Sequence, residues 1–135
     1  MRRLLLDTTY LIDAERSGDA IDEAIDDEDD VAIAAVTIAE LRVGALRAKG
    51  RRRAARQAYV DDVVGTLPII SYDLGVAEAH AELLVAVRMQ GRPRGAHDLL
   101  IAASGLATGR VIITADHSAF SELPGVFAEL HRGPC

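Results

Sequence analysis

The amino-acid sequence predicts an α/β fold with a short parallel sheet sandwiched by helices, and three observations support this prediction. The chain has 135 residues, which is the size of one domain. Half of its residues are hydrophobic but only 4% are aromatic, so the core must consist of aliphatic side chains. Short apolar runs alternate with segments of helical periodicity, as in a parallel sheet with helical crossovers. No repeat or linker divides the chain, and we expect a single domain over residues 1–135.

The first half of the chain begins with a strand at residues 3–6, which are rich in leucine. A helix of one or two turns comes next and should end near Gly18. Apolar positions then recur at helical spacing over residues 19–28, which predicts a helix with an acidic outer face. Residues 31–36 form a continuous apolar run of the kind found in buried strands.

The segment after that run has the signals of a helix over residues 37–50. Thr37 and Glu40 have the spacing of a capping box, in which two side chains satisfy backbone amides at the start of a helix. Gly50 stands where this helix would stop. The remaining expected elements are a helix at about 52–65, a strand at 67–71, a long amphipathic helix at 73–91 closed by Gly91, a loop at 91–95, a helix at 97–109, a strand at 110–114, a turn or short helix at 118–123 and an edge strand at 126–130.

Composition also narrows the cellular setting. The only cysteine is Cys135, so no internal disulfide can form and nothing points to an oxidising compartment. The N-terminal arginines and leucines do not form a signal peptide, because Asp7 interrupts the apolar run too early. No segment approaches the roughly 18 apolar residues that span a bilayer. The sequence therefore predicts a cytoplasmic protein without a membrane segment.

The net charge of −6 conceals two segregated charge runs. Residues 19–30 contain eight acids and no base, whereas residues 47–56 contain six bases and no acid. Both runs are compatible with solvated helix faces. The basic run is equally compatible with binding to a polyanion, because clustered positive charge attracts phosphate groups.

Four acidic residues from distant parts of the chain are expected at one edge of the sheet. In open parallel sheets, functional groups gather beyond the carboxyl ends of the strands, where the helices begin. Asp7 follows the first strand, and Glu40 lies near the start of the helix after the second strand. Asp98 begins the helix after the arginine-containing loop, and Asp116 follows the strand at 110–114.

Each of these acids also has a local explanation. Asp7 could cap the first helix, Glu40 could belong to the capping box, and Asp98 could interact with a helix dipole. Asp116 could be an ordinary turn residue. Four such acids on one edge of a sheet are harder to explain as independent caps, so we treat them together as a candidate site.

Converging carboxylates repel one another unless protonation or a divalent cation relieves the charge. An all-oxygen set without cysteine suits hard ions such as Mg²⁺ or Mn²⁺. Such ions support hydrolysis of phosphodiester bonds, because they generate hydroxide from water and stabilise the leaving oxygen. Thr8, Thr9 and Thr114 carry hydroxyl groups that are well placed to orient the carboxylates or waters.

Four segments of the chain resemble the PIN domains of VapC-type toxins from bacterial type II toxin–antitoxin pairs. They are "LLLDTTYLID" (4–13), "TIAELRVGAL" (37–46), "HDLLIAASGLATGRVIITAD" (97–116) and "AFSELPGV" (119–126). The likeness covers nearly the whole chain and preserves the order and spacing of all four acidic motifs. It implies a single PIN domain over residues 1–135.

The resemblance implies a metal-dependent endoribonuclease that uses Mg²⁺, with Mn²⁺ able to substitute. The acidic quartet of the family, which implies both catalytic and metal-binding roles, falls on Asp7, Glu40, Asp98 and Asp116. Of these, Asp7 and Asp98 match the positions most regularly described as metal ligands. The resemblance also implies homodimers and a VapB-type antitoxin whose C-terminal tail covers the acidic pocket. The implied substrate is structured RNA, such as tRNA or ribosomal RNA.

One residue departs from the family pattern, and two histidines near the acids are not part of it. Ala119 stands before Phe120, where many relatives carry a further acid. His117, beside Asp116, is not part of the motif, and we interpret it as a turn residue. We interpret His97 as a surface or helix-start residue.

RNA binding by an acidic protein requires a local basic surface. We expect the RNA backbone to contact the basic run and the loop at 91–95, which together comprise Arg47, Lys49, Arg51, Arg52, Arg53, Arg56, Arg92 and Arg94. Phosphate contacts of this kind position a substrate without selecting bases. The scarcity of aromatic residues argues against stacking of single-stranded bases and favours recognition of RNA shape.

Three alternatives follow from the same residues. A phosphatase with an aspartyl-phosphate intermediate also places Asp after its first strand, but Thr9 stands where a second Asp is needed and Lys49 is the only lysine. A catalytically inactive PIN-like module would bind RNA or protein, although the acidic quartet is complete. A PIN nuclease outside toxin–antitoxin systems would carry the same acids.

Overall fold

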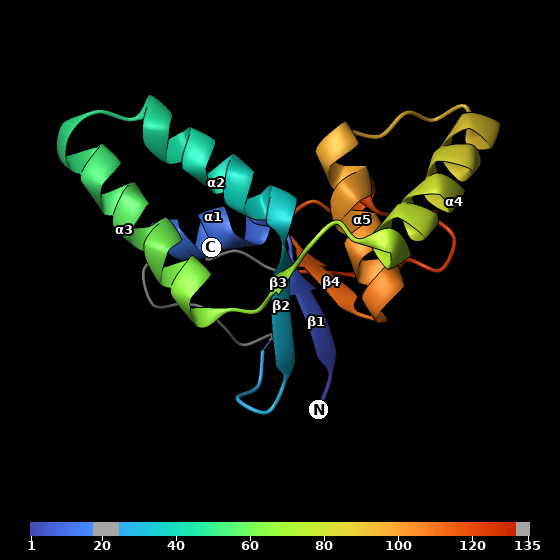
Figure 1. Ribbon diagram of the computed structural model, residues 1–135, viewed down its shortest axis with the longest axis horizontal. Helices are drawn as coiled ribbons and strands as arrows, with labels where there is room; N and C mark the ends of the chain where they lie inside the picture. Colours follow the sequence, from blue (N-terminus) through green and yellow to red (C-terminus); the bar gives the residue numbers. More distant parts are fainter. Residues whose placement is uncertain (18–24, 132–135) are drawn as a thin grey trace.

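A parallel sheet of five short strands divides the helices into two groups (Figure 1). The computed structural model describes residues 1–17 and 25–131. The strands are β1 (Arg3–Leu6), β2 (Asp30–Ala34), β3 (Ile69–Ile70), β4 (Val111–Thr114) and β5 (Ala128–Leu130), in the spatial order β3-β2-β1-β4-β5. The predicted α/β class, with a short parallel sheet sandwiched by helices, is confirmed.

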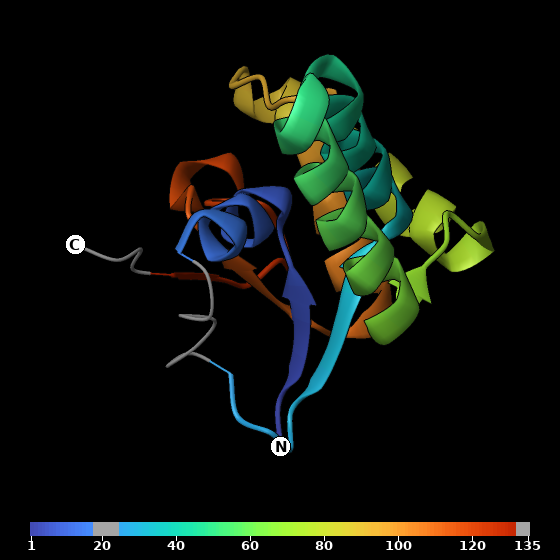
Figure 2. The ribbon, with the colours of Figure 1, turned by 90° about the vertical axis from the view of Figure 1, so that its left-hand side faces the viewer.

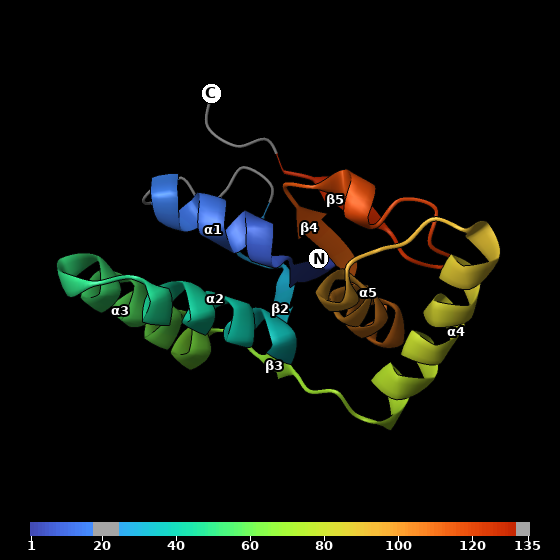
Figure 3. The same cartoon turned by 90° about the horizontal axis from the view of Figure 1, so that it is seen from above.

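Helices cover both faces of this sheet. Those in the described residues are α1 (Thr8–Ser17), α2 (Ala35–Arg47), α3 (Gly50–Thr66), α4 (Leu74–Gln90), α5 (Ala96–Thr108) and the short 3₁₀ helix η1 (His117–Ala119). Helices α2 and α3 run side by side as an antiparallel pair (Figure 2). Seen from above, α1, α2 and α3 lie on one side of the molecule and α4 and α5 on the other (Figure 3).

Strand β1 occupies the centre of the sheet because its leucines are buried on both faces. Leu5 is in register with Ala32 of β2 and with Ile112 of β4. Successive side chains of a strand point to opposite faces, so Leu4 and Leu6 face away from Leu5. A continuous apolar run is therefore what a strand covered by helices on both sides requires.

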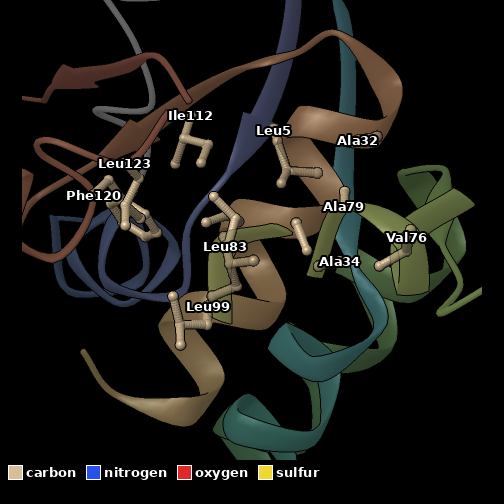
Figure 4. Packing of buried hydrophobic residues seen from close by; sticks show 13 residues of the cluster. Leu5, Ala32, Ala34, Val76, Ala79, Leu83, Leu99, Ile112, Phe120 and Leu123 are labelled. Carbon is tan, nitrogen blue, oxygen red and sulfur yellow. The ribbon is translucent and has the colours of Figure 1, made fainter. Parts of the chain in front are cut away.

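Two aliphatic clusters fill the space between the sheet and its helices. On one face, Leu5 packs in a cluster with Leu83 of α4 and Leu99 of α5 (Figure 4). On the opposite face, Leu4 and Leu6 belong to a cluster that also contains Tyr10 of α1 and Val60 of α3. Fully burying one such leucine contributes about 1.5–3 kcal/mol, so these clusters hold the carboxyl ends of the strands in place.

The structure corrects the expected boundary between β2 and α2. The strand ends at Ala34, whose backbone is extended (φ −79°, ψ 148°), and α2 begins directly after it, two residues earlier than expected. Thr37, Leu41 and Ala45 are all buried, which places Thr37 on the inner face of the helix rather than at its cap. Ala34 is the N-cap residue and makes no side-chain hydrogen bond. The interpretation of Thr37 and Glu40 as a capping box is therefore wrong.

The turn between α2 and α3 also differs from the expectation. Helix α2 ends at Arg47, the chain turns at Ala48 and Lys49, and Gly50 begins α3 instead of ending α2. Gly50 has a φ of +59°, a left-handed conformation that glycine adopts without the steric cost of a β-carbon. Gly50 therefore lies at the turn between the two helices, but it is the first residue of α3 and not the end of α2.

Most of the remaining expected elements are confirmed. Helix α4 ends at Gly91, which takes the left-handed conformation with a φ of +66°. Strand β5 lies at one edge of the sheet. The helix expected at 19–28 falls mostly outside the described residues, and residues 25–28 are not helical. In the described part of the chain, no helix is both long and apolar enough to cross a membrane.

Candidate active site

Asp7 lies at the centre of the acidic edge and is nearly inaccessible, with only 2% of its surface exposed. Its backbone amide donates to the carbonyl of Ile113 in β4, which fixes Asp7 directly after β1. Its carboxylate accepts hydrogen bonds from the backbone amide of Thr8 at 2.8 Å and from the hydroxyls of Thr9 at 2.8 Å and Thr114 at 2.7 Å. Two of the three threonines predicted to orient carboxylates therefore hold Asp7 through their hydroxyls.

Burial raises the pKa of Asp7 above the usual carboxyl value. The hydrogen bonds from Thr114, Thr9 and Thr8 lower this pKa without cancelling the shift, and the charge of Glu40 raises it further. Among the described residues, no basic side chain forms an ion pair with Asp7. A buried carboxylate in this setting gains stability from any cation that reaches it.

This raised pKa predicts how stability depends on pH when no metal is bound. As the pH rises above about 3.8, Asp7 of the unfolded chain releases its proton first, so the folded state loses stability until its own raised pKa is passed. We expect the free energy of unfolding of the wild type, relative to Asp7→Asn, to fall with rising pH in EDTA. Urea unfolding at pH 4 to 8 measures this difference, and adding Mg²⁺ should recover stability in the wild type only. A difference that does not change with pH would contradict the prediction.

Glu40 reaches the site from α2 and is held there by a threonine from another helix. The hydroxyl of Thr8 donates to Glu40 Oε1 at 2.7 Å and also lies 3.1 Å from the hydroxyl of Thr37. Thr37 is fully buried, and Thr8 is 6% exposed. The pair that resembled a capping box therefore joins α2 to the start of α1. Sequence reasoning missed Thr37 as a site residue because its spacing from Glu40 matched a local motif.

Asp98 lies in the first turn of α5, where the sequence places it. Desolvation raises its pKa, and the negative charges of Asp7, Glu40 and Asp116 raise it further. The charge of His97 acts in the opposite direction. The contacts agree that the four acids share one site. Glu40 and Asp98 line the same hollow. Thr8 bonds to both Asp7 and Glu40, and Thr114 bonds to both Asp7 and the backbone of Asp116.

Asp116 is exposed at the outer side of the same edge, directly before η1. Its backbone amide donates to the hydroxyl of Thr114 at 2.9 Å, and Ser118 donates to its carboxylate at 2.6 Å. The same Thr114 hydroxyl donates to Asp7, so one buried threonine links the two acids. Sequence reasoning did not identify Ser118, and its place two residues after an acid is the signal that could have found it.

The donor chemistry of this site fits a hard divalent cation. All four acids offer carboxylate oxygens, and the pKa values of Asp7 and Asp98 are raised by burial and by the negative charge of neighbouring acids. In the described part of the chain, no three His, Cys, Asp or Glu side chains are grouped closely enough to hold an ion by themselves. Mg²⁺ does not require such a cage, because it is commonly bound by one or two carboxylates and keeps several waters.

The basic run predicted to bind RNA lies at the corner between α2 and α3. Its exposed members are Arg47, Lys49, Arg51, Arg52 and Arg53. Arg56 is half-buried and donates to the carbonyl of Gly44 at 3.2 Å. Arg52 and Arg56 also line a groove of about 290 Å³ that extends to Glu40. Two arginines of the basic run therefore share a groove with Glu40, one of the four acids.

Arg92 and Arg94 occupy a different setting from the basic run. Both are half-buried, and their guanidinium groups donate to the turn that follows Asp116. His97 is exposed over 60% of its side chain, with its Nδ1 atom 3.4 Å from Glu40 Oε2. His117 begins η1, and its carbonyl accepts from the amides of Phe120 and Ser121, as expected of a turn residue.

The fold and the acidic edge together define the class of this protein. A parallel sheet in the order β3-β2-β1-β4-β5 carries a buried aspartate after its central strand, with further acids from α2, α5 and the end of β4. The family model of the PIN domain matches residues 4–126. The chain therefore belongs to the PIN domain family.

The relatives narrow this class to one group within the family. The chain is 39% identical to Ribonuclease VapC5 of Mycobacterium tuberculosis (strain ATCC 25618 / H37Rv) over 124 residues, which cover 90% of this chain and 87% of that protein. It is 32% identical to Ribonuclease VapC4 of the same organism, over 93% of this chain and 95% of the relative. These similarities place it among the VapC-type members of the family.

Solved structures agree with this assignment. VapBC-5 from Mycobacterium tuberculosis, described as a member of the VapBC family of toxin–antitoxin systems, superposes with a TM-score of 0.80 at 30% identity. That match covers 97% of this chain and 100% of the other. VapBC2 from Rickettsia felis, bound to a DNA fragment from its promoter, has a TM-score of 0.82 at 20% identity over 96% of this chain and 99% of the other, which is a likeness of fold alone.

Proposed function

We propose that this chain is the toxin of a type II toxin–antitoxin pair and acts as a metal-dependent endoribonuclease. The observation that carries the proposal is the gathering of Asp7, Glu40, Asp98 and Asp116 at one sheet edge around a buried carboxylate. The names of the VapC relatives support ribonuclease activity. A complete acidic quartet weighs against a module that has lost catalysis.

In this proposal, the four acids would together hold Mg²⁺ or Mn²⁺, with Asp7 and Asp98 as the main ligands and Glu40 and Asp116 beside them. Such an ion, when bound, supplies an activated water and stabilises charge on the phosphodiester. Thr9 and Thr114 keep the carboxylate of Asp7 in one orientation through hydrogen bonds of 2.8 and 2.7 Å.

Glu40 has a separate part in this proposal. Thr8 holds its Oε1 atom, and Oε2, which lies 3.4 Å from His97 Nδ1, is the oxygen that would orient an attacking water or accept its proton. Such an arrangement would suit a general base that a neighbouring hydroxyl keeps in place. The corresponding partner at Asp116 is Ser118, whose hydroxyl donates to Oδ1.

The substrate in this proposal is structured RNA, such as tRNA or ribosomal RNA. A relative in Shigella flexneri, 28% identical over 72% of this chain and 72% of that protein, is named a tRNA(fMet)-specific endonuclease, which supports tRNA as a candidate. The exposed basic run, whose Arg52 shares a groove with Glu40, would bind the phosphate backbone. The small number of aromatic residues favours recognition of shape.

The proposed partner is a VapB-type antitoxin, because solved neighbours of this fold are VapBC complexes. We propose that a segment of the antitoxin covers the acidic edge and stops cleavage, within a toxin homodimer or a toxin–antitoxin hetero-oligomer. Adding the cognate antitoxin to the purified toxin should abolish cleavage. Undiminished activity in the complex would rule this mechanism out.

Cleavage of total cellular RNA by the purified protein tests the proposed activity. The reaction should run with Mg²⁺, with Mn²⁺ and with EDTA, using protein shown to be folded and free of antitoxin. We expect discrete fragments with either metal and none with EDTA. If total RNA stays intact under every condition, DNA and defined RNAs are tested next. If these also stay intact, a binding module without catalysis is favoured.

A further inference from the structure

Two segments that adjoin the acidic edge are joined by a pair of arginines. Arg92 and Arg94 lie in the loop between α4 and α5, six and four residues before Asp98, and we call this pair the arginine clamp. Arg92 Nη2 donates to the carbonyl of Ser118 at 3.0 Å, and Nη1 donates to the carboxylate of Glu122 at 3.2 Å. Arg94 donates to the carbonyl of Ser121 at 2.7 Å and to that of Arg92 at 2.6 Å.

The turn held by the arginine clamp needs outside support. Glu122 has a φ of +64°, and it is the only non-glycine residue with a positive φ in the described part of the chain. Left-handed backbone is unfavourable for a residue with a β-carbon, and it persists where surrounding contacts maintain it. Gln90 supplies another such contact, because its amide donates to the carbonyl of Glu122 at 2.6 Å.

The held turn connects directly to one of the four acids. Ser118 accepts from Arg92 through its carbonyl and donates through its hydroxyl to Asp116 Oδ1 at 2.6 Å. On the other side of the clamp, Gly95 precedes α5 so closely that a β-carbon there would lie 3.0 Å from Asp98 Oδ2. The arginine clamp therefore joins the turn after Asp116 to the loop that leads into α5, the helix that carries Asp98.

We propose that Arg92 and Arg94 are positioning residues that hold Asp116 in place relative to Asp98, a role that rests on the proposed metal-dependent function. Both terminal nitrogens of each guanidinium already donate to protein acceptors, which distinguishes the clamp from the exposed basic run. The planar guanidinium can serve several acceptors at once, whereas the ammonium of a lysine cannot reproduce this geometry.

The test compares Arg92→Gln and Arg92→Lys with Arg51→Gln, a matched control in the exposed basic run. Binding of Mn²⁺ alone is measured by electron paramagnetic resonance at equal folded content, and RNA binding is measured in EDTA at several salt concentrations. We expect both Arg92 variants to lose about tenfold or more in Mn²⁺ affinity, as found for partners that orient metal ligands. They should also lose kcat with little change in KM, while RNA affinity and its salt dependence stay unchanged. Arg51→Gln should instead bind Mn²⁺ normally but bind RNA more weakly, with a flatter salt dependence.

An Arg92→Gln protein that binds Mn²⁺ normally but binds RNA more weakly, with a flatter salt dependence, would overturn the proposal in favour of a phosphate contact. If the Arg92 variants fail to fold, Ser118→Ala tests the proposal instead. This variant removes only the hydroxyl that links the arginine clamp to Asp116. Normal Mn²⁺ affinity in Ser118→Ala would then overturn the proposal. A wild type that neither binds Mn²⁺ nor cleaves RNA would overturn both the proposed function and this inference. An active wild type whose Arg92 variants bind Mn²⁺ and cleave RNA normally would overturn this inference alone.

Discussion

Replacing Asp7 by asparagine is expected to abolish metal-dependent RNA cleavage while the protein stays folded. The amide has nearly the same shape as the carboxylate but carries no charge, so it cannot attract a cation to a buried position. A bound metal stabilises the transition state by several kcal/mol, and each 1.4 kcal/mol corresponds to about tenfold in rate. We therefore expect the cleavage rate to fall by at least about a hundredfold.

Asp98→Asn should reproduce this loss, because Asp98 shares the site and its pKa is raised by burial and by the other three acids. Asp62→Asn is the matched control, since it makes the same chemical change at an exposed position on α3. Initial rates on one RNA with Mg²⁺ are compared after circular dichroism has shown equal folded content. Cleavage by Asp7→Asn or Asp98→Asn at the rate of the Asp62→Asn control would mean that these acids serve only the fold.

Reversing the charge of Arg51, Arg52 and Arg53 is expected to weaken RNA binding by at least about tenfold. These exposed arginines lie at the corner between α2 and α3, in an otherwise acidic protein with a net charge of −6. Each phosphate contact that is lost lowers the slope of log affinity against log salt by about one. The triple Glu variant should therefore bind more weakly at low salt and show a markedly flatter salt dependence.

Fluorescence anisotropy with a labelled structured RNA in EDTA measures this effect without cleavage. Arg3→Glu provides a control, because Arg3 is exposed at the opposite end of β1 from the acidic edge and undergoes the same change per residue. Its affinity should stay within about twofold of the wild type. Equal salt slopes for the triple variant and the wild type would assign the basic run to another role.

Much of the fold could be predicted from the sequence because it depends on local patterns. The apolar runs at 3–6 and 110–114 correspond to β1 and β4, since a strand covered on both faces needs aliphatic side chains throughout. Helix α4 and its end at Gly91 could also be predicted from the sequence. Element boundaries were harder to predict. Strand β2 ends two residues before its apolar run does, because the backbone turns into α2 directly after Ala34.

The sequence by itself determined the order of the elements and the four acids that the parallel topology gathers at one edge. Only the tertiary structure decided what their neighbours do. Thr37 had the spacing of a cap, yet it contacts Thr8 from another helix. Arg92 was predicted only from its charge, and the structure adds its hydrogen bond to the turn after Asp116. A side chain's chemistry is set by its type, but its partner is set by packing between segments far apart in the chain, which local spacing does not encode.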